Sequence, residues 1–240
     1  MVVAPYRAIV FDLFDTLVHF RARPDPSVGW LREAFAAVGD DRQFEAFTAA
    51  LREVSMEIVA ARGNELREVT SHERFRRALE RIAADPAAAE PLSAVHMAHI
   101  ASLTHLPPHH PTLVETLAAS HRLAVVSNFD HTATARAVLA RHGIDRHFEV
   151  ILISADFGRR KPHPAIFTEA LRRLDVAPHE ALYVGDTHAD DVVGALAAGM
   201  DVAWLAPPDA AHREPAPTHR IADLAALRDL RPPAGRRRAP

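Results

Sequence analysis

The chain has 240 residues, of which 48% are hydrophobic and 25% charged, which is typical of a globular protein with one large domain or one domain carrying a smaller insert. Its net charge of −3 argues against general nucleic-acid binding, and its longest apolar runs are too short to span a bilayer. The absence of cysteine excludes disulfides, thiolate metal sites and a cysteine nucleophile. No basic stretch precedes a long apolar one at the N-terminus, so we expect a cytoplasmic protein without a secretory signal.

The first part of the chain predicts one strand followed by a long helical segment. The apolar run over residues 7–13 predicts a buried strand, and roughly residues 19–110 show apolar residues at three- and four-residue spacing. Thr70 and Glu73 fit the capping box of one helix, and a weaker helix is predicted over 92–103. The apolar stripes are Val28, Leu31, Phe35 and Val38; Phe44, Phe47, Leu51, Val54 and Ile58; and Phe75, Leu79 and Ile82. We expect these stripes to pack together as an inserted helical bundle.

The rest of the chain alternates between short apolar runs and helical patterns. The runs predict strands at 122–127, 149–154, 181–185 and 201–205, and the helical patterns lie at 131–143, 163–174 and 190–200. A proline-rich surface segment over 205–219 precedes a last short helix near 222–230. Such alternation predicts βαβ units, a mainly parallel sheet and an α/β fold class.

Polar residues stand where the predicted strands end. Asp12, Ser127 and Asp186 each follow or close an apolar run, and Lys161 opens the helix after the third strand. The carboxyl ends of parallel strands meet at one crevice, so we expect these side chains to lie close together. Lys161 is the single lysine in a chain whose other cationic side chains are arginines, which favours a role for its compact, flexible ammonium.

This set of residue types suits attack by a carboxylate on a phosphoryl group with the help of Mg²⁺. A carboxylate can displace an alkoxide from phosphorus and form an aspartyl-phosphate. An acidic pair, Asp186 with Asp190 or Asp191, offers the oxygen ligands that Mg²⁺ prefers. The metal and the lysine would neutralise charge on the transferred group.

Four stretches resemble the motifs of the haloacid dehalogenase (HAD) superfamily, in the subfamily with a helical cap between the first and second motifs. They are VFDLFDTL, VVSN, KPHPAIF and YVGDTHADDVVGALAAGM, and they occur in the family's order at the expected strand ends. The resemblance implies a Rossmann-like core and a mobile inserted cap. The predicted boundaries are residues 1–18 and 108–230 for the core and 19–107 for the cap, with 231–240 as a flexible tail.

The resemblance also implies roles for single residues. Asp12 would be the nucleophile, and Ser127, Asn128 and Lys161 would bind the phosphoryl group, although Ser127 and Asn128 also suit a turn. The metal ligands would be Asp12, Asp186, Asp191 and the backbone carbonyl of Phe14. Of the neighbours Asp190 and Asp191, one is expected to cap the helix that opens at Val192 while the other serves the site, and the family's spacing favours Asp191 for the metal.

The chain departs from the family's phosphatases at position 14. They usually carry a second aspartate two residues after the nucleophile, which protonates the leaving alkoxide, whereas this chain has Phe14 there and Asp15 one residue later. On a strict strand Asp15 would face away from Asp12, and its expected role is that of a turn residue. A positioned general acid is typically worth ~10²–10⁴-fold in rate, so the difference bears on the reaction.

Four interpretations follow from this departure. The favoured one is a Mg²⁺-dependent hydrolase of small phosphomonoesters with a reactive substrate or a substitute acid, such as Asp15, His19 or a cap residue. The second is a metal-independent 2-haloacid dehalogenase. Dehalogenases of the family often have an aromatic residue at this position, which Phe14 matches, but they typically lack the Gly-Asp acid motif retained here. A phosphonatase would need a cap lysine, and this cap has none. The fourth is a non-catalytic phosphate-binding or protein-interaction module. We expect a small phosphorylated or halogenated substrate, no membrane or nucleic-acid partner, and a monomer or homodimer.

Overall fold

The computed structural model describes residues 6–22 and 28–233. Residues 234–240 of the predicted tail, 1–5 of the predicted core and 23–27 of the predicted cap lie outside the described residues. None of the helices in the described part of the chain has the length and apolar character that a membrane span requires.

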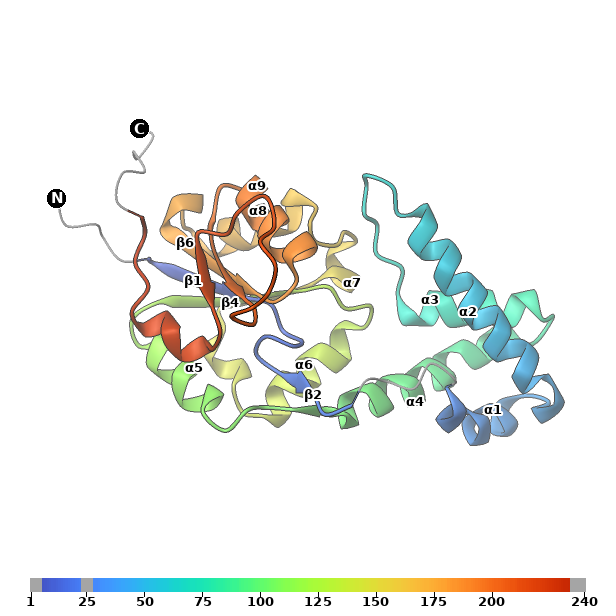
Figure 1. The fold of residues 1–240 in the computed structure, drawn as a ribbon. Helices are drawn as coiled ribbons and strands as arrows, with labels where there is room; N and C mark the ends of the chain where they lie inside the picture. The colour runs from blue at the N-terminus through green and yellow to red at the C-terminus, as the bar shows by residue number, and fades with distance from the viewer. Residues whose placement is uncertain (1–5, 23–27, 234–240) are drawn as a thin grey trace.

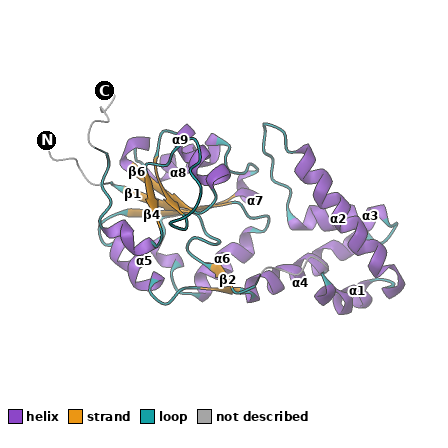
Figure 2. Ribbon diagram, viewed as in Figure 1, coloured by secondary structure: helices purple, strands orange, loops and turns teal. Residues whose placement is uncertain are grey.

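Six parallel strands form the central sheet, in the order β5-β4-β1-β6-β7-β8 (Figure 2). The strands are β1 (Ala8–Phe11), β4 (Arg122–Ser127), β5 (Val150–Ile153), β6 (Ala181–Gly185), β7 (Asp201–Leu205) and β8 (His219–Ile221). All five predicted strands are present within a residue or two of their predicted limits. β8 was not predicted, because it is three residues long and follows the proline-rich segment. The predicted Rossmann-like α/β fold is confirmed.

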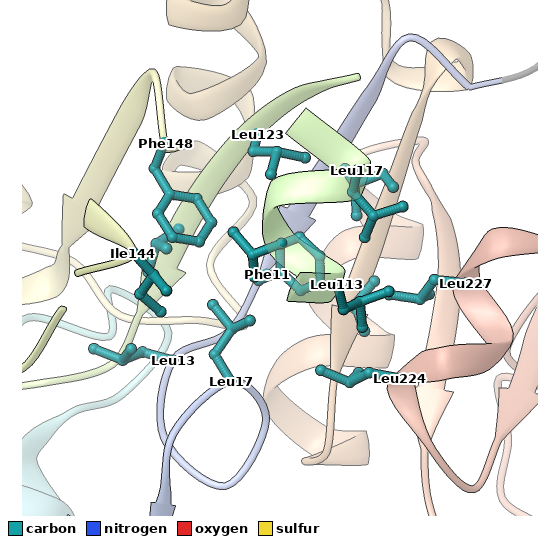
Figure 3. Packing of buried hydrophobic residues seen from close by; sticks show 14 of the residues in the cluster. Phe11, Leu13, Leu17, Leu113, Leu117, Leu123, Ile144, Phe148, Leu224 and Leu227 are labelled. Atoms are coloured by element: carbon teal, nitrogen blue, oxygen red, sulfur yellow. The ribbon is translucent and has the colours of Figure 1, made fainter. Parts of the chain in front are cut away.

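Helices cover both faces of this sheet (Figures 1 and 2). They are α5 (His110–Ala118) and α6 (Thr132–Arg141) on one face, and α8 (Pro164–Leu174) and α9 (Val193–Ala197) on the other, with the short α7 (Ser154–Phe157) after β5. Strand residues alternate between the two layers: Ile9 and Phe11 belong to one buried cluster, Ala8 and Val10 to the other. In the first cluster Phe11 lies among Leu113, Leu117 and Leu224 (Figure 3).

Four helices form a separate bundle beside the sheet (Figure 1). They are α1 (Arg32–Val38), α2 (Phe44–Ala61), α3 (Ser71–Arg81) and α4 (Ala89–Ser102), and they bury their own apolar cluster. The predicted stripes make up most of that cluster, except that Val38 is 39% exposed. Thr70 caps α3 as predicted, since its hydroxyl accepts from the Glu73 backbone N–H at 3.3 Å. The Glu73 carboxylate pairs with Arg76 and Arg77, so the reciprocal bond of a capping box is not formed.

Shorter turns connect these elements. One-turn 3₁₀ helices occur at Gly29–Leu31, Asp41–Gln43, Pro86–Ala88, Asp145–His147 and Pro178–Glu180, a longer one at Leu224–Arg228, and a π-helical turn at His188–Val192. The segments that lead into and out of the bundle pair with each other, because β2 (His19–Phe20) lies antiparallel to β3 (Thr104–His105).

The connection between α2 and α3 gives the bundle a second contact with the core. The Arg160 backbone N–H donates to the Leu66 carbonyl at 2.8 Å, and the Glu68 N–H donates to the Gly158 carbonyl at 3.0 Å. The side chains of Arg160 and Glu68 also form an ion pair at 2.5 Å. The bundle is therefore tied to the core at two places that are far apart in the sequence.

The packing of His96 in the bundle predicts a pH dependence of stability. The His96 ring lies 5.8 Å from the Trp30 ring and 5.4 Å from the Phe75 ring, centroid to centroid. Burial lowers the pKa of His96 to about 4, with Arg74 and His99 acting in the same direction. The folded protein therefore binds this proton more weakly than the unfolded chain, whose histidine pKa is about 6.5. Protonation must then favour unfolding as the pH falls from 6.5 towards 4.

We expect His96 to contribute about 2 kcal/mol to the loss of unfolding free energy between pH 7 and pH 5. The His96→Gln variant should show a pH dependence weaker by that amount in urea unfolding. His72→Gln, at an exposed position on α3, is the matched control and should retain the wild-type pH dependence. An identical pH dependence in wild type and His96→Gln would contradict the prediction.

Candidate active site

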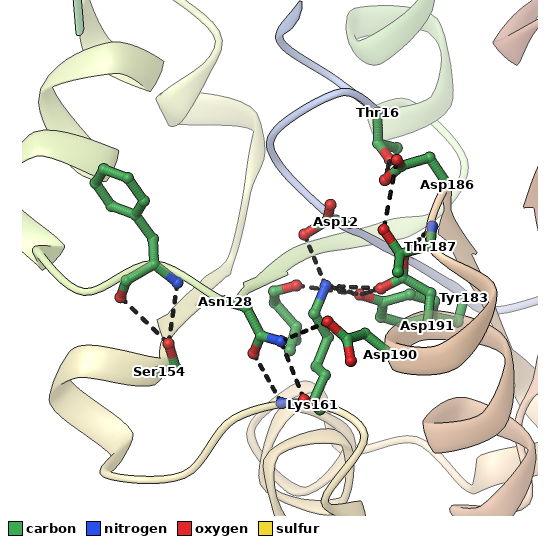
Figure 4. A network of polar contacts seen from close by, with 12 residues as sticks. Asp12, Thr16, Asn128, Ser154, Lys161, Tyr183, Asp186, Thr187, Asp190 and Asp191 are labelled. Carbon is green, nitrogen blue, oxygen red and sulfur yellow. Dashed lines mark hydrogen bonds and ion pairs between the residues drawn. The ribbon is translucent and has the colours of Figure 1, made fainter. Parts of the chain in front are cut away.

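The predicted site residues meet in one crevice at the carboxyl ends of the strands. Asp12 directly follows β1, Ser127 closes β4 and Asp186 directly follows β6. These residues help to line a cavity of about 180 Å³, together with Phe14, Asp15, Asn128, Arg160, Lys161, Thr187, Asp190 and Asp191. The crevice thus combines the chain's single lysine with five carboxylates, of which Figure 4 labels Asp12, Asp186, Asp190 and Asp191.

The Lys161 ammonium lies at the centre of a buried polar network (Figure 4). It donates to Asp12 Oδ1 at 2.7 Å, to Asp191 Oδ1 at 2.7 Å and to the Tyr183 hydroxyl at 2.9 Å. All three N–H groups of the ammonium therefore have an acceptor. Lys161 is 3% exposed and Asp191 is fully buried, so both ion pairs lie away from water.

Burial sets the protonation of this network. It raises the pKa of the Asp12 carboxyl to about 7, with Asp191 and Asp186 adding to the rise and Lys161 opposing it. Burial works to lower the pKa of Lys161, but the carboxylates of Asp12 and Asp191 outweigh it and hold that pKa above its usual value. Lys161 therefore stays protonated, and its single positive charge does not fully offset the negative charge of the clustered carboxylates.

The sequence reasoning missed Tyr183, which belongs to this network. Its hydroxyl accepts from Lys161 and lies 3.1 Å from both the Val126 carbonyl and Asp191 Oδ1, to either of which it can donate. Burial, followed by the charges of Asp191 and Asp12, raises the pKa of Tyr183 well above its usual value, so the phenol stays neutral. The available signal was a tyrosine inside an otherwise aliphatic strand, since a buried phenol needs a hydrogen-bond partner.

Three carboxylates are arranged so that they could hold a metal ion. Asp12, Asp186 and Asp191 each offer one oxygen, and these oxygens lie within 4.8 Å of one another. Burial raises the pKa of Asp186, with Asp191 and Asp15 adding to the rise. Crowded oxygen donors of this kind fit a hard divalent cation such as Mg²⁺, which would relieve their repulsion.

Asp191 can join this group because residue 185 is glycine. A Cβ at Gly185 would lie 2.4 Å from Asp191 Cγ, closer than real Cβ contacts allow. The π-helical turn that carries Asp191 is further fixed by the Thr187 backbone N–H, which donates to Asp191 Oδ2 at 2.8 Å. The carboxylate is therefore held by backbone geometry as well as by Lys161.

The capping role expected for Asp190 or Asp191 was wrong. No side chain accepts a capping bond at the start of α9. Asp190 instead accepts from Asn128 Nδ2 at 3.2 Å, across the crevice, because the π-helical turn directs both carboxylates towards β4 and Lys161. Burial raises the pKa of Asp190.

Asn128 holds the loop that carries Lys161. Its side-chain oxygen accepts from the Lys161 N–H at 2.7 Å, and its side-chain nitrogen donates to the Lys161 carbonyl at 3.0 Å. This pair of bonds joins the end of β4 to the start of α8 and fixes the lysine backbone. Ser127, next to Asn128, is buried and lines the crevice.

Phe14 and Asp15 lie side by side on the crevice wall. The Phe14 ring stacks on Phe20 at 5.3 Å and contacts Phe129 at 4.7 Å, centroid to centroid. Asp15 has φ of 59°, in the left-handed region that aspartate tolerates better than most residues. Its N–H donates to the Val18 carbonyl at 2.7 Å, as expected of a turn residue. The same turn makes Asp15 a lining residue of the crevice, and its carboxylate accepts from the Phe20 N–H at 3.4 Å.

Comparison with known proteins places the fold and motifs in one family. Residues 6–199 match the hydrolase family described as haloacid dehalogenase-like hydrolase. The chain belongs to the haloacid dehalogenase-like hydrolases. The predicted family is thereby confirmed, and the chain is a HAD-like hydrolase.

Both phosphatases and dehalogenases occur among its relatives. The chain is 38% identical to the glyceraldehyde 3-phosphate phosphatase of Methanopyrus kandleri over 125 residues, which are 51% of this chain and 53% of that protein. That match spans about half the length of the relative. This chain is also 33% identical over 184 residues to the phosphoserine phosphatase of Thermus thermophilus, and the match covers 75% of this chain and 71% of that protein. Among solved structures, the 2-haloacid dehalogenase of Pseudomonas syringae pv. Tomato DC3000 has a TM-score of 0.74 at 26% identity, covering 93% of this chain and 96% of that one.

We expect Gly185→Ala to lower the free energy of unfolding by about 1–3 kcal/mol, because the added Cβ overlaps the Asp191 carboxylate. The measurement is urea unfolding at pH 7. Gly39→Ala is the matched control, since a Cβ there has no contact closer than 3.5 Å and the backbone is extended, so its stability should stay within about 0.5 kcal/mol of wild type. Equal stabilities of the two variants would show that Asp191 does not pack against Gly185.

Proposed function

We propose that this HAD-like hydrolase is a Mg²⁺-dependent phosphatase that cleaves small phosphomonoesters through an aspartyl-phosphate on Asp12. The observation that carries the proposal is the group of three carboxylates, Asp12, Asp186 and Asp191, beside the buried ammonium of Lys161. The phosphatases among the relatives support phosphoester hydrolysis over dehalogenation. We expect the enzyme to act in the cytoplasm, as a monomer or homodimer, with residues 19–107 serving as its cap.

In the first half-reaction Asp12 is the nucleophile. One carboxylate oxygen forms a bond to phosphorus while the bond to the leaving alkoxide breaks, and the alkoxide departs with a proton from an acid in the crevice. Lys161 holds Asp12 Oδ1 at 2.7 Å and so orients the carboxylate. The lysine and the Ser127 hydroxyl would bind the non-bridging oxygens of the phosphoryl group.

In the second half-reaction water attacks the phosphorus of the aspartyl-phosphate. The bond between phosphorus and the Asp12 oxygen breaks, and the proton of the water passes to the acid that had protonated the alkoxide. Phosphate leaves, and both the Asp12 carboxylate and the acid are restored. A Mg²⁺ ion held by Asp12, Asp186, Asp191 and the Phe14 carbonyl would neutralise negative charge on the transferred group.

Asp15 is the best-placed candidate for the acid that position 14 lacks. The residue lines the crevice, and its charge is close enough to Asp186 to add to the rise in the pKa of that group. Asp190 lines the same crevice, but its carboxylate accepts from the Asn128 side chain that also holds the Lys161 backbone, whereas the Asp15 carboxylate accepts from the backbone N–H of Phe20. We therefore assign proton donation to Asp15 and a structural role to Asp190.

The second candidate function is haloacid dehalogenation, which one feature favours. The aromatic Phe14 lines the crevice that contains Asp12, and a leaving halide needs no proton. The structural similarity to a 2-haloacid dehalogenase agrees with this. One observation opposes dehalogenation. Displacement of halide needs no divalent cation, so the carboxylates of Asp186 and Asp191 would have no role in that reaction.

A substrate panel tests the choice of reaction. We expect phosphate release from small phosphomonoesters with Mg²⁺ and its loss with chelator, and no halide release from 2-haloacids under either condition. Asp12→Asn should lower phosphate release by at least about 10³-fold, because an amide does not attack phosphorus. Asp209→Asn, at an exposed position, should keep wild-type activity. Halide release without metal, in the absence of phosphatase activity, would overturn the proposal in favour of a dehalogenase.

Asp15→Asn tests the source of the proton. Asparagine tolerates the same left-handed backbone and can still accept from the Phe20 N–H, so the fold should be retained. We expect a loss of about 10²-fold on unactivated alkyl phosphates, whose leaving group needs a proton. On p-nitrophenyl phosphate the loss should be within about twofold, since that leaving group departs as a stable anion. An equal loss on both substrates would assign Asp15 to local structure alone.

A further inference from the structure

A second cavity adjoins the catalytic crevice on the side of the helical bundle. Its volume is about 230 Å³, and it lies between α2, the α2–α3 connection and the core loops around Asn128 and Arg160. Both of those residues also line the crevice that contains Asp12, so the two cavities share a wall. No step of the proposed phosphoryl transfer uses the second cavity.

Arginines dominate the charge of this cavity. It is lined by Arg62, Arg74 and Arg160 and by two carboxylates, Glu68 and Asp130. Two of the arginines already have anionic partners, since Arg74 pairs with Asp130 at 2.7 Å and Arg160 with Glu68 at 2.5 Å. The Glu68 carboxylate also accepts from the Ser154 hydroxyl.

Arg62 is the unbalanced cation of the group. Among the residues that the structure describes, its side chain makes no hydrogen bond and no ion pair, and its Nε is buried without an acceptor. The Nε of Arg74 is buried without an acceptor on the same cavity. Buried N–H groups of this kind are rare in native proteins and indicate a ligand or an ordered water.

The surroundings make a positive charge at Arg62 unfavourable by itself. Burial lowers the pKa of Arg62, and the positive charges of Arg160 and Arg74 act in the same direction, although the charges of Glu68 and Asp190 oppose them. An anion in the cavity would supply acceptors for the two orphan donors and would offset that charge. A planar guanidinium fits carboxylate and phosphate oxygens especially well.

We propose that this cavity is an anion subsite, in which Arg62 and Arg74 bind a second oxyanion of the substrate while its phosphomonoester lies at Asp12. The inference rests on the proposed function and narrows the substrate class to small phosphomonoesters that carry a carboxylate or a second phosphate. The subsite selects substrates through the bundle, whereas the core performs the chemistry.

Binding to a protein that cannot turn over gives a direct test. In the Asp12→Asn background with Mg²⁺, calorimetry should show 3-phosphoglycerate binding at least about tenfold more tightly than glycerol 3-phosphate, which lacks the carboxylate. The pair of fructose 1,6-bisphosphate and fructose 6-phosphate distinguishes a second phosphate from a carboxylate. Adding Arg62→Gln should reduce the preference to within about twofold, and Arg62→Lys should retain part of it.

Arg67→Gln is the matched control, because Arg67 is an exposed arginine of the same connection, and it should leave the preference unchanged. Equal binding within both substrate pairs, or a preference that survives Arg62→Gln, would overturn the anion subsite and assign the cavity to solvent alone. In active enzyme the same Arg62→Gln change should raise KM for the doubly anionic substrates and leave KM for glycerol 3-phosphate within about twofold. Absence of phosphate release from every ester in wild-type protein would overturn the proposed function, an outcome distinct from equal binding.

Discussion

The site depends on the buried ammonium of Lys161. Carboxylates taken out of water are costly unless they are paired and hydrogen-bonded, and this lysine pairs with both Asp12 and Asp191 at 2.7 Å. One positive charge against two buried carboxylates, with Asp186 close by, still leaves excess negative charge, and the pKa of Asp12 remains raised to about 7. This excess of negative charge is what makes a divalent cation favourable there.

The position of that ammonium is fixed by packing that extends into the core. Asn128 holds the lysine backbone with two hydrogen bonds, and the Tyr183 hydroxyl accepts from the side chain. Tyr183 in turn packs its ring against Phe167 at 5.0 Å, centroid to centroid. Phe167 can lie there because residue 194 has no side chain, since a Cβ at Gly194 would come within 2.5 Å of the Phe167 ring. Helix packing on one face of the sheet thereby helps to fix the ion pair of Lys161 with Asp12 at the carboxyl ends of the strands.

The sequence was sufficient for features that depend on local pattern. Five strands were predictable because each is a continuous apolar run buried on both faces. Asp12, Ser127 and Asp186 were predictable as crevice residues because each follows or closes such a run. β8 and the β2–β3 ribbon were not, since strands of two or three residues form only through pairing with distant segments. The role of Asn128 depends on where the Lys161 backbone lies, and the orphan donor of Arg62 depends on the contact between bundle and core. Both features depend on how segments distant in the sequence pack together, so the local sequence pattern could not predict them.

Position 14 shows how backbone geometry can change the meaning of spacing. The crevice already holds five carboxylates, and the two cations that line it are Lys161 and Arg160. Burial, with repulsion from neighbouring carboxylates, already raises the pKa of Asp12 and Asp186, and another carboxylate at position 14 would add to that repulsion. Phe14 instead packs with Phe20 and Phe129 and closes one wall. The rule that residue +3 faces away from residue 12 requires a continued strand, but β1 ends at Phe11 and the chain turns at φ of 59° on Asp15. Asp15 therefore lines the crevice one residue later than the family's spacing predicts, at a position whose side chain also stabilises the turn through the Phe20 N–H.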